Sequence, residues 1–242
     1  MTNIVTVNDP KSPISEAYRN IRTNIEFSSI DSDLKAIVFT SSQPNEGKTT
    51  VISNLAVTFA NLDKKVLIID CDLRNPSIYK KFRISNMVGV TDVLLGRKDF
   101  NSCVQITNVN NLDILAGGEI PFNPSEILSS KKMKQFISEM KSIYDYVFID
   151  APPIGIVTDA GIISTYSDGV VMVVGSNEAT IDLARLSIDR LNKVNANILG
   201  VVLNKLKIEK GNSTYGYYGY YYKQESGSRS SRNSKRKSKR KK

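Results

Sequence analysis

Six short apolar runs, rich in β-branched residues, recur along the chain and alternate with segments of helical periodicity. Runs that lack a polar face are typical of strands in a parallel sheet that is covered on both sides. The pattern therefore predicts an α/β fold, a doubly wound and mostly parallel sheet with helices on both faces. The predicted strands are 35–40, 65–70, 112–117, 146–150, 169–174 and 198–204, and the helical patterns after the first strand are about 48–62, 125–142, 158–166 and 179–195.

An amphipathic helix is predicted ahead of the first strand, over residues 13–28. Isoleucines recur within it at helical spacing, and Ser12 followed by Pro13 suits an N-cap and a first helical position. Glu16, Arg19 and Arg22 are spaced three residues apart, which places them on one face of this helix. From the residues alone, we interpret that face as a solvated surface of ion pairs.

Residues 42–50, Ser-Gln-Pro-Asn-Glu-Gly-Lys-Thr-Thr, follow a predicted strand and open a helix. Such a loop directs backbone N–H groups and the helix dipole at phosphate oxygens. We expect Lys48 at the β- and γ-phosphates and the Thr49 hydroxyl on Mg²⁺. Ser42 stands where the GxxxxGK[ST] pattern has its first glycine. The loop assigns the predicted sheet to the P-loop NTPase type, with ATP contacts at Ser42, Gln43, Pro44, Asn45, Glu46, Gly47, Lys48, Thr49 and Thr50.

Carboxylates follow two of the predicted strands. Asp70 closes one strand, and Asp72 lies two residues further on, on the same face of the strand end. Asp150 closes another strand, where an acid that positions Mg²⁺ is expected. Three acids at the carboxyl edge of the sheet, beside a phosphate loop, predict a metal–phosphate site. Asp159 and Asp168 are interpreted as a helix-start residue and a turn residue.

The character of the chain changes after about residue 210. Residues 211–222 hold six tyrosines among Gly, Ser, Thr and Asn, and residues 223–242 are rich in Ser, Lys and Arg. Neither segment has enough apolar surface to offset the entropy of an ordered chain, so both are predicted to be disordered in isolation. The predicted organisation is therefore a P-loop domain over 1–210, a tyrosine cluster over 211–222 and a basic tail over 223–242.

Charge and composition exclude several classes of function. The net charge of +9 resides in residues 223–242, where ten basic residues face one acid, which leaves 23 of each in residues 1–222. A neutral domain offers no basic surface, so no nucleic-acid partner is expected. Histidine is absent, which excludes a His base, and Cys71 and Cys103 are interpreted as core thiols. With neither an apolar run of about 20 residues nor a secretory start, we expect a cytoplasmic protein.

A site that binds Mg-ATP serves either hydrolysis, which orients a water, or transfer to a hydroxyl, which needs a base. Asp70 and Asp72 supply two carboxylates where one suffices for the metal, so one of them is available as the base. A flexible tether presents the tyrosines to a nearby site at high effective concentration. Together these features favour a tyrosine kinase that acts on its own Tyr215, Tyr217, Tyr218, Tyr220, Tyr221 and Tyr222.

The ordered set of motifs resembles the bacterial tyrosine kinases of capsular and exopolysaccharide synthesis, in particular the type whose transmembrane activator is a separate chain. The resemblance covers residues 11–222. It is carried by SPISEAYRNIRTNI, SSQPNEGKTT, VLIIDCDLRNPS, GVTDVLLG, LAGGEIPFNPSEIL, YDYVFIDAPPIGIVTDA, GVVLN and the tyrosine cluster. It implies an ATP-dependent, non-specific protein-tyrosine kinase (ATP:protein-tyrosine phosphotransferase) that autophosphorylates in trans.

The resemblance also implies roles for single residues. Lys48 and Thr49 would bind phosphate and Mg²⁺. Asp72 and Asp150 would hold the metal, largely through water. Asp70 would be the base for the incoming tyrosine.

Partners follow from the same resemblance. Glu16, Arg19 and Arg22 would build the interface of a homo-oligomeric ring in which each tail enters the site of its neighbour. A transmembrane activator, the chain-length regulator, would complete the nucleotide site and recruit the chain to the inner face of the cell membrane. A cognate phosphatase would reverse the reaction. Arg74 either lines the site or forms a structural ion pair, and the basic tip 235–242 either binds anionic lipid or is a solvated tail.

The main rival to a kinase is a spatial-organiser ATPase of the MinD/ParA type, which shares the fold and the Walker motifs. Those proteins carry a second lysine after the first glycine of the loop, where this chain has Gln43. They also lack a tyrosine cluster. A nucleic-acid-binding protein is suggested only by the basic tip, and a nucleotide-binding scaffold without kinase activity is disfavoured by Lys48 and the three acids. Asn204, at the end of the last predicted strand, either contacts the base or only closes the strand.

Overall fold

The computed structural model describes residues 4–28 and 33–206. The described residues through Lys205 make up the first compact unit of the chain. The tyrosine cluster, the basic tail and all six predicted phosphorylation sites lie outside the described residues. Their predicted disorder therefore stays a prediction.

A seven-stranded sheet forms the centre of the first unit, in the order β3-β4-β2-β5-β1-β6-β7. Every neighbouring pair is parallel except β3 and β4. This confirms the predicted fold class, and each of the six predicted strands is present. The strands are β1 (Ala36–Ser41), β2 (Val66–Asp70), β3 (Gln105–Ile106), β4 (Leu112–Leu115), β5 (Tyr146–Asp150), β6 (Gly169–Gly175) and β7 (Ile198–Asn204).

The longer predicted helices are also present, with one correction. The pattern at 125–142 forms two helices instead of one, because the backbone of Ser130 is extended and interrupts it. The Ser130 side chain accepts a hydrogen bond from the Met133 N–H at 3.1 Å, so Ser130 is the N-cap of the second helix. Four short helices, α1, α4, α5 and α6, were not predicted. The helices are α1 (Val5–Asn8), α2 (Pro13–Ser28), α3 (Lys48–Ala60), α4 (Ile78–Phe82), α5 (Val90–Leu94), α6 (Phe100–Cys103), α7 (Pro124–Ser129), α8 (Lys131–Ile143), α9 (Asp159–Ser164) and α10 (Ile181–Lys193).

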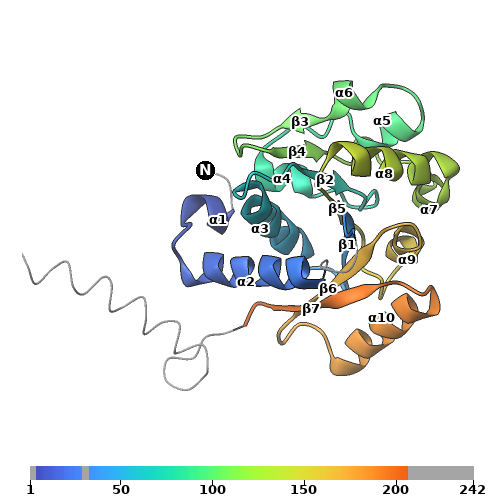
Figure 1. The fold of residues 1–242 in the computed structure, drawn as a ribbon. Coiled ribbons are helices and arrows are strands. Elements are labelled where there is room, and N and C mark those ends of the chain that lie inside the picture. The colour runs from blue at the N-terminus through green and yellow to red at the C-terminus, as the bar shows by residue number, and fades with distance from the viewer. Residues whose placement is uncertain (1–3, 29–32, 207–242) are drawn as a thin grey trace, which may run out of the picture. The chain divides into compact units, whose positions relative to one another are not determined.

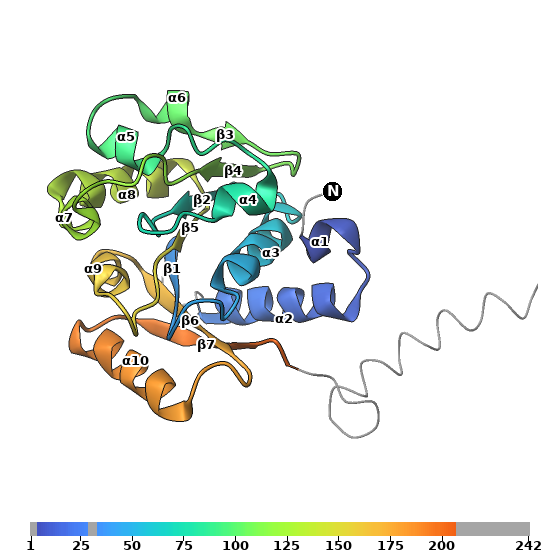
Figure 2. The same cartoon turned by 180° about the vertical axis from the view of Figure 1, so that it is seen from behind.

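Helices cover both faces of the sheet. Helices α2 and α3 lie on one face, and α8, α9 and α10 lie on the other (Figure 1). The view from behind shows the same division (Figure 2). The strands between them are apolar on both sides, as the sequence pattern predicts for such a sheet.

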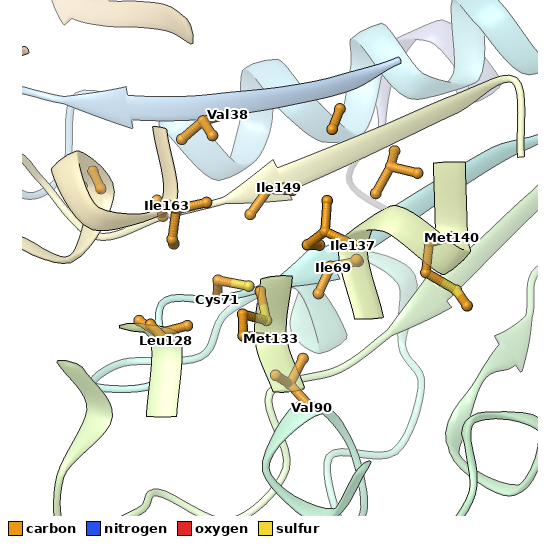
Figure 3. Close-up of a cluster of buried hydrophobic side chains, with 14 of the residues drawn as sticks. Val38, Ile69, Cys71, Val90, Leu128, Met133, Ile137, Met140, Ile149 and Ile163 are labelled. Carbon is orange, nitrogen blue, oxygen red and sulfur yellow. The ribbon is translucent and has the colours of Figure 1, made fainter. Parts of the chain in front are cut away.

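The core on the α8–α9 face is a cluster of aliphatic side chains. Val38, Ile69 and Ile149 project from three neighbouring strands, and Ile137 of α8 and Ile163 of α9 cover them (Figure 3). All five are at most 1% exposed. Burial of this kind is the main favourable contribution to the stability of such a domain.

The core on the opposite face is built around aromatic rings. Phe148 lies at the centre, with ring centroids 5.1 Å from Phe39 and 5.3 Å from Phe59. Phe59 belongs to α3, which is buried along nearly its whole length. This packing fixes the helix that begins at the phosphate loop.

Both cysteines are buried and unpaired, which confirms the interpretation of Cys71 and Cys103 as core thiols. In the described part of the chain, no helix combines the length and the apolar character that crossing a bilayer requires.

Three chain segments meet at the carboxyl edge of the sheet. Asp150, at the end of β5, is the register partner of Phe39 on one side and of Asp70 on the other. The loops after β1, β2 and β5 therefore start side by side. Strand β1 lies between β5 and β6, so the phosphate loop leaves the sheet where such folds bind ligands.

We expect Phe148→Ala to lower the free energy of unfolding by about 3–5 kcal/mol, because it leaves a cavity among packed rings. Urea unfolding measures this loss. Phe122→Ala is the matched control, since its side chain is 99% exposed; we expect a change below about 0.5 kcal/mol. Equal losses in the two variants would contradict the placement of Phe148 in the core.

Candidate nucleotide-binding and phosphoryl-transfer site

The phosphate loop turns at a glycine. Gly47 has a φ of +89°, a conformation that L side chains rarely adopt, and a Cβ there would lie 2.1 Å from Asn204 Nδ2. Helix α3 begins at the next residue. The N–H groups of Thr50 and Val51 donate to the Gly47 carbonyl, whereas those of Lys48 and Thr49 have no carbonyl partner within the helix. These donors and the positive end of the helix dipole form a cradle suited to phosphate.

Glu46 holds this loop in shape. Its carboxylate is buried and accepts hydrogen bonds from Ser42 Oγ at 2.8 Å, from the Gln43 N–H at 2.8 Å and from the Gly175 N–H at 3.0 Å. Asn204 Nδ2 donates to the Glu46 carbonyl at 2.9 Å. The Glu46 carboxylate is thus bound to other groups of the protein. The part of residues 42–47 that is left to contact a phosphate is their backbone.

Lys48 places a buried ammonium group among three carboxylates. Its Nζ donates to Asp150 Oδ1 and lies 3.7 Å from Asp72 Oδ2. Burial alone would lower the pKa of Lys48, but the carboxylates of Asp150, Asp72 and Asp70 outweigh that effect and raise its pKa. The structure therefore brings together the predicted cation and the three predicted acids.

Asp150 also receives the hydroxyl of the phosphate loop. Thr49 Oγ1 donates to Asp150 Oδ2 at 2.9 Å and lies 2.9 Å from Ser77 Oγ. Lys48 and Thr49, successive residues of the loop, are thus bound to the two oxygens of one carboxylate.

Asp70 is fully buried and its carboxylate accepts three backbone N–H groups. The donors are Ser77 at 2.8 Å, Ile78 at 3.0 Å and Asp72 at 3.2 Å. Burial, and next the charge of Asp150, raise the pKa of Asp70 to about 7. The pKa of Asp72 is also raised, mainly by burial, although its side chain is 12% exposed and so more accessible than that of Asp70.

Two neighbours of the site were not found from the sequence. Ser77 contacts Thr49, and Lys81 Nζ donates to Thr50 Oγ1 at 2.9 Å. Ser77 immediately precedes α4 and Lys81 lies within it, and a helix of five residues is too short to show a clear apolar period. Ser77 is the last residue of the motif VLIIDCDLRNPS, but no spacing in the sequence signals its contact with Thr49 or that of Lys81 with Thr50.

The residues present fit a magnesium ion bound together with phosphate. Among the described residues, no group of three or more Asp, Glu, His or Cys side chains could hold a metal by itself. Mg²⁺ usually takes only one or two carboxylates and completes its shell with phosphate oxygens and water. Thr49, Asp72 and Asp150 supply a hydroxyl and two carboxylates of this kind beside the phosphate loop.

Arg74 forms an ion pair, which was one of the two roles considered for it. Its Nε donates to Asp159 Oδ2 at 2.8 Å. Asp159 is the first residue of α9, as predicted, and its side chain is fully buried. Asp168 lies in the turn before β6. Its carboxylate accepts hydrogen bonds from the N–H groups of Lys35 and Ala36 and so holds the beginning of β1.

The charged face of α2 is only partly solvated. Glu16 and Arg19 form an ion pair at the surface, as predicted. For Arg22 the prediction of a solvated side chain was wrong: it is 15% exposed, and its Nη1 donates to the Thr58 carbonyl of α3 at 2.9 Å. The spacing of the apolar residues in α2 did not indicate that α3 packs beside this helix. The interface role of these three residues stays a prediction.

The remaining residues that were predicted to contact the nucleotide lie at the tip of the phosphate loop and on its far side. Pro44 and Asn45 are exposed, and Asn45 has a φ of +68°. Gln43 Nε2 donates to the Glu178 carbonyl at 2.6 Å. Asn204 ends β7, as predicted, and binds the Glu46 carbonyl, so its amide holds the loop to the last strand.

We expect Gly47→Ala to weaken the binding of a fluorescent ATP analogue about tenfold, because a left-handed backbone costs an L residue about 1–2 kcal/mol. Gly96→Ala is the control: its φ is +72°, but its only close neighbour is Lys132 Nζ at 3.8 Å, in a turn far from the loop in sequence. That variant should lose a similar amount of stability and keep its affinity. Normal affinity in Gly47→Ala would contradict the phosphate cradle.

Comparison with known proteins places this chain in a family. Residues 34–205 match a family described as AAA domain. Tyrosine-protein kinase YwqD of Bacillus subtilis (strain 168) is 45% identical over 217 residues, which cover 90% of this chain and 91% of that protein. The crystal structure of the chimerical protein CapA2B2 is 37% identical with a TM-score of 0.82, and the match covers 85% of this chain and 90% of that one.

A more distant likeness bears on the MinD-type rival. The septum site-determining protein MinD of Pyrococcus horikoshii OT3, complexed with Mg-ADP, is 24% identical with a TM-score of 0.61, over 75% of this chain and 73% of that one. That likeness shows the fold alone. The far higher identity lies with the kinases, as the ordered motifs predicted. The chain is a protein-tyrosine kinase, and it belongs to the family of bacterial tyrosine-protein kinases.

Proposed function

We propose that this chain transfers the γ-phosphoryl group of Mg-ATP to the tyrosines of residues 215–222 in another copy of itself. In doing so it regulates capsular or exopolysaccharide synthesis together with a transmembrane activator. One observation carries the proposal. Lys48 and Thr49, the first two residues of α3, both contact the Asp150 carboxylate. This arrangement places a cation, a hydroxyl and a carboxylate where the phosphates of a nucleotide are expected.

The proposed reaction is an in-line displacement. The phenolic oxygen of a tyrosine attacks the γ-phosphorus, the bond from that phosphorus to the β–γ bridging oxygen breaks, and ADP leaves. The phenolic proton passes to Asp70. Lys48 and the N–H groups of the loop hold the phosphate oxygens as their charge redistributes.

Magnesium, when bound, neutralises charge on the β- and γ-phosphates. Thr49 would hold it directly, and Asp72 and Asp150 would do so largely through water. Asp70 is left as the base because it is the acid not assigned to the metal. Its carboxylate is held in place by the N–H groups of Ser77 and Ile78.

The kinase is favoured over a MinD-like ATPase by the loop as well as by the tail. Gln43 stands where the ATPases have their second lysine, and its amide is bound to the Glu178 carbonyl. The loop therefore offers no second cation at this position. Six tyrosines within residues 215–222 supply the acceptor that a kinase needs.

Autophosphorylation in trans suits a cycle of assembly and release. Each phosphate adds a charge of about −1.5 to −2 at neutral pH. Several phosphates on one short segment would repel one another and the acids of the site, which favours release of the tail and dissociation of a ring. Glu16, Arg19 and Arg22 of α2 are the proposed interface of that ring.

The remaining proposed partners are the activator and a phosphatase. The activator would complete the nucleotide site and hold the chain at the inner face of the cell membrane, and the cognate phosphatase would reset the tail. No nucleic-acid partner is proposed, because residues 1–222 carry equal numbers of acidic and basic residues.

Mixing two copies, neither of which can label itself, tests transfer in trans. One copy keeps Lys48 and has all six tyrosines of residues 215–222 replaced by Phe, and the other carries Lys48→Met with the tyrosines intact. With labelled ATP, Mg²⁺ and an activator segment, we expect tyrosine label on the Lys48→Met copy, because the site and the acceptor lie on different chains. Phosphosite mapping by mass spectrometry measures it.

Each copy alone is the control and should stay unlabelled. A wild type that labels itself while the mixture does not would show transfer within one chain. Release of phosphate without any label on protein would contradict the kinase and favour the ATPase.

A further inference from the structure

A small polar cluster includes part of the loop between β2 and α4, which carries Asp72, and it has no role in the reaction described above. Arg74 donates to Asp159 through Nε at 2.8 Å and through Nη2 at 3.3 Å. Ser125 Oγ accepts from Arg74 Nη2 at 2.9 Å and donates to Asp159 Oδ1 at 2.7 Å. We call these three residues the Arg74 clamp.

The clamp joins three separate parts of the fold. Arg74 lies in the loop between β2 and α4, Ser125 in the first turn of α7, and Asp159 at the start of α9. The chain reaches Asp159 from Asp150 through the loop that follows β5. The clamp therefore ties the loop that carries Asp72 to the two helices that pack beside it on the α8–α9 face.

Arg74 is only two residues from Asp72, and a tight turn links them. The Asn75 N–H donates both to the Asp72 carbonyl at 3.0 Å and to Asp72 Oδ1 at 3.2 Å, which closes the turn 72–75. The other oxygen of Asp72 lies 3.7 Å from Lys48 Nζ. Holding Arg74 thus holds the turn, and the turn sets where the Asp72 carboxylate meets the cation of the phosphate loop.

The burial of the clamp fits a positioning role. The Asp159 side chain is fully buried, whereas that of Arg74 is 42% exposed. The Arg74 end of the ion pair is open to water, whereas the Asp159 carboxylate would lose its cation in a buried place if Arg74 were removed. Helices α7 and α9 already contribute Leu128 and Ile163 to one buried cluster, so their packing has an apolar basis. A displacement of about 1 Å in a positioned group, by contrast, can cost about a hundredfold in rate.

We propose that Asp159 and Ser125 are positioning residues for phosphoryl transfer, which act through Arg74 to hold Asp72 at the metal–phosphate site. The inference rests on the proposed function, because Asp72 matters to the rate only if it serves that site. Neither residue is among those proposed to contact the nucleotide or the acceptor tyrosine. Their effect is expected on the rate and on the need for magnesium, more than on the affinity for nucleotide.

A double-mutant cycle on the full chain tests the proposal. We expect Asp159→Asn and Arg74→Gln each to lower kcat at least tenfold and to raise the Mg²⁺ concentration that gives half the maximal rate. The KM for ATP should change much less. Because both act through one contact, the double variant should be no slower than the slower single variant.

Glu119→Gln is the matched control. It removes the ion pair with Arg97 in a neighbouring loop, where the two side chains are 71% and 51% exposed, and should leave every kinetic value unchanged. If Asp159→Asn does not fold, as its melting curve would show, Ser125→Ala with Arg74→Gln completes the same cycle. We then expect a smaller loss in Ser125→Ala, which again adds nothing to that of Arg74→Gln.

Two results would overturn the inference. One is a kcat and a magnesium dependence like those of wild type in the folded single variants. The other is a double variant whose loss equals the product of the two single losses, since the residues would then act independently. A wild type that never labels its own tyrosines would instead overturn the proposed function, so the two failures are distinguishable.

Discussion

The ion pair between Lys48 and Asp150 is the interaction on which the rest of the site depends. An ammonium group buried to this degree is costly unless a carboxylate pairs with it, and removing either partner leaves an uncompensated buried charge. The pairing exists because β1 and β5 are neighbours in the sheet, so the phosphate loop and Asp150 start from the same edge. The position of the proposed nucleotide site is therefore a consequence of strand order.

The surroundings of that pair limit how far it can move. Glu46 and Asn204 hold the loop, and Asp70 holds the turn that leads to α4. Helix α3 is fixed by the aromatic core beneath it. A phosphoryl-transfer site needs mainly alignment and charge, and both are supplied here by rigid elements. The proposed acceptor tyrosines lie on a segment of very different composition, whose predicted disorder would let them reach a site that itself stays fixed.

The parts that were predictable from the sequence are those set by local periodicity or by a motif. The six longer strands, α2 and α3 follow from patterns that a single segment carries, and the juxtaposition of Lys48 with three acids follows because each of these residues lies at or after the end of a predicted parallel strand. Contacts between distant segments carry no such sign: Ser77, Lys81 and the burial of Arg22 against α3 depend on how elements pack. Short elements such as α4 and β3 span too few residues to show a period. The break at Ser130 was readable in principle as an N-cap signal, but the continuous apolar period hid it.

The most direct test of the central claim is calorimetric titration of ATP with and without Mg²⁺, in wild type and in Asp150→Asn. If Lys48, Thr49 and Asp150 form one Mg-ATP site, magnesium should tighten binding strongly in wild type. Most of that gain should be lost in Asp150→Asn, whose side chain no longer carries a negative charge. Equal ATP affinity in wild type with and without magnesium would contradict the account.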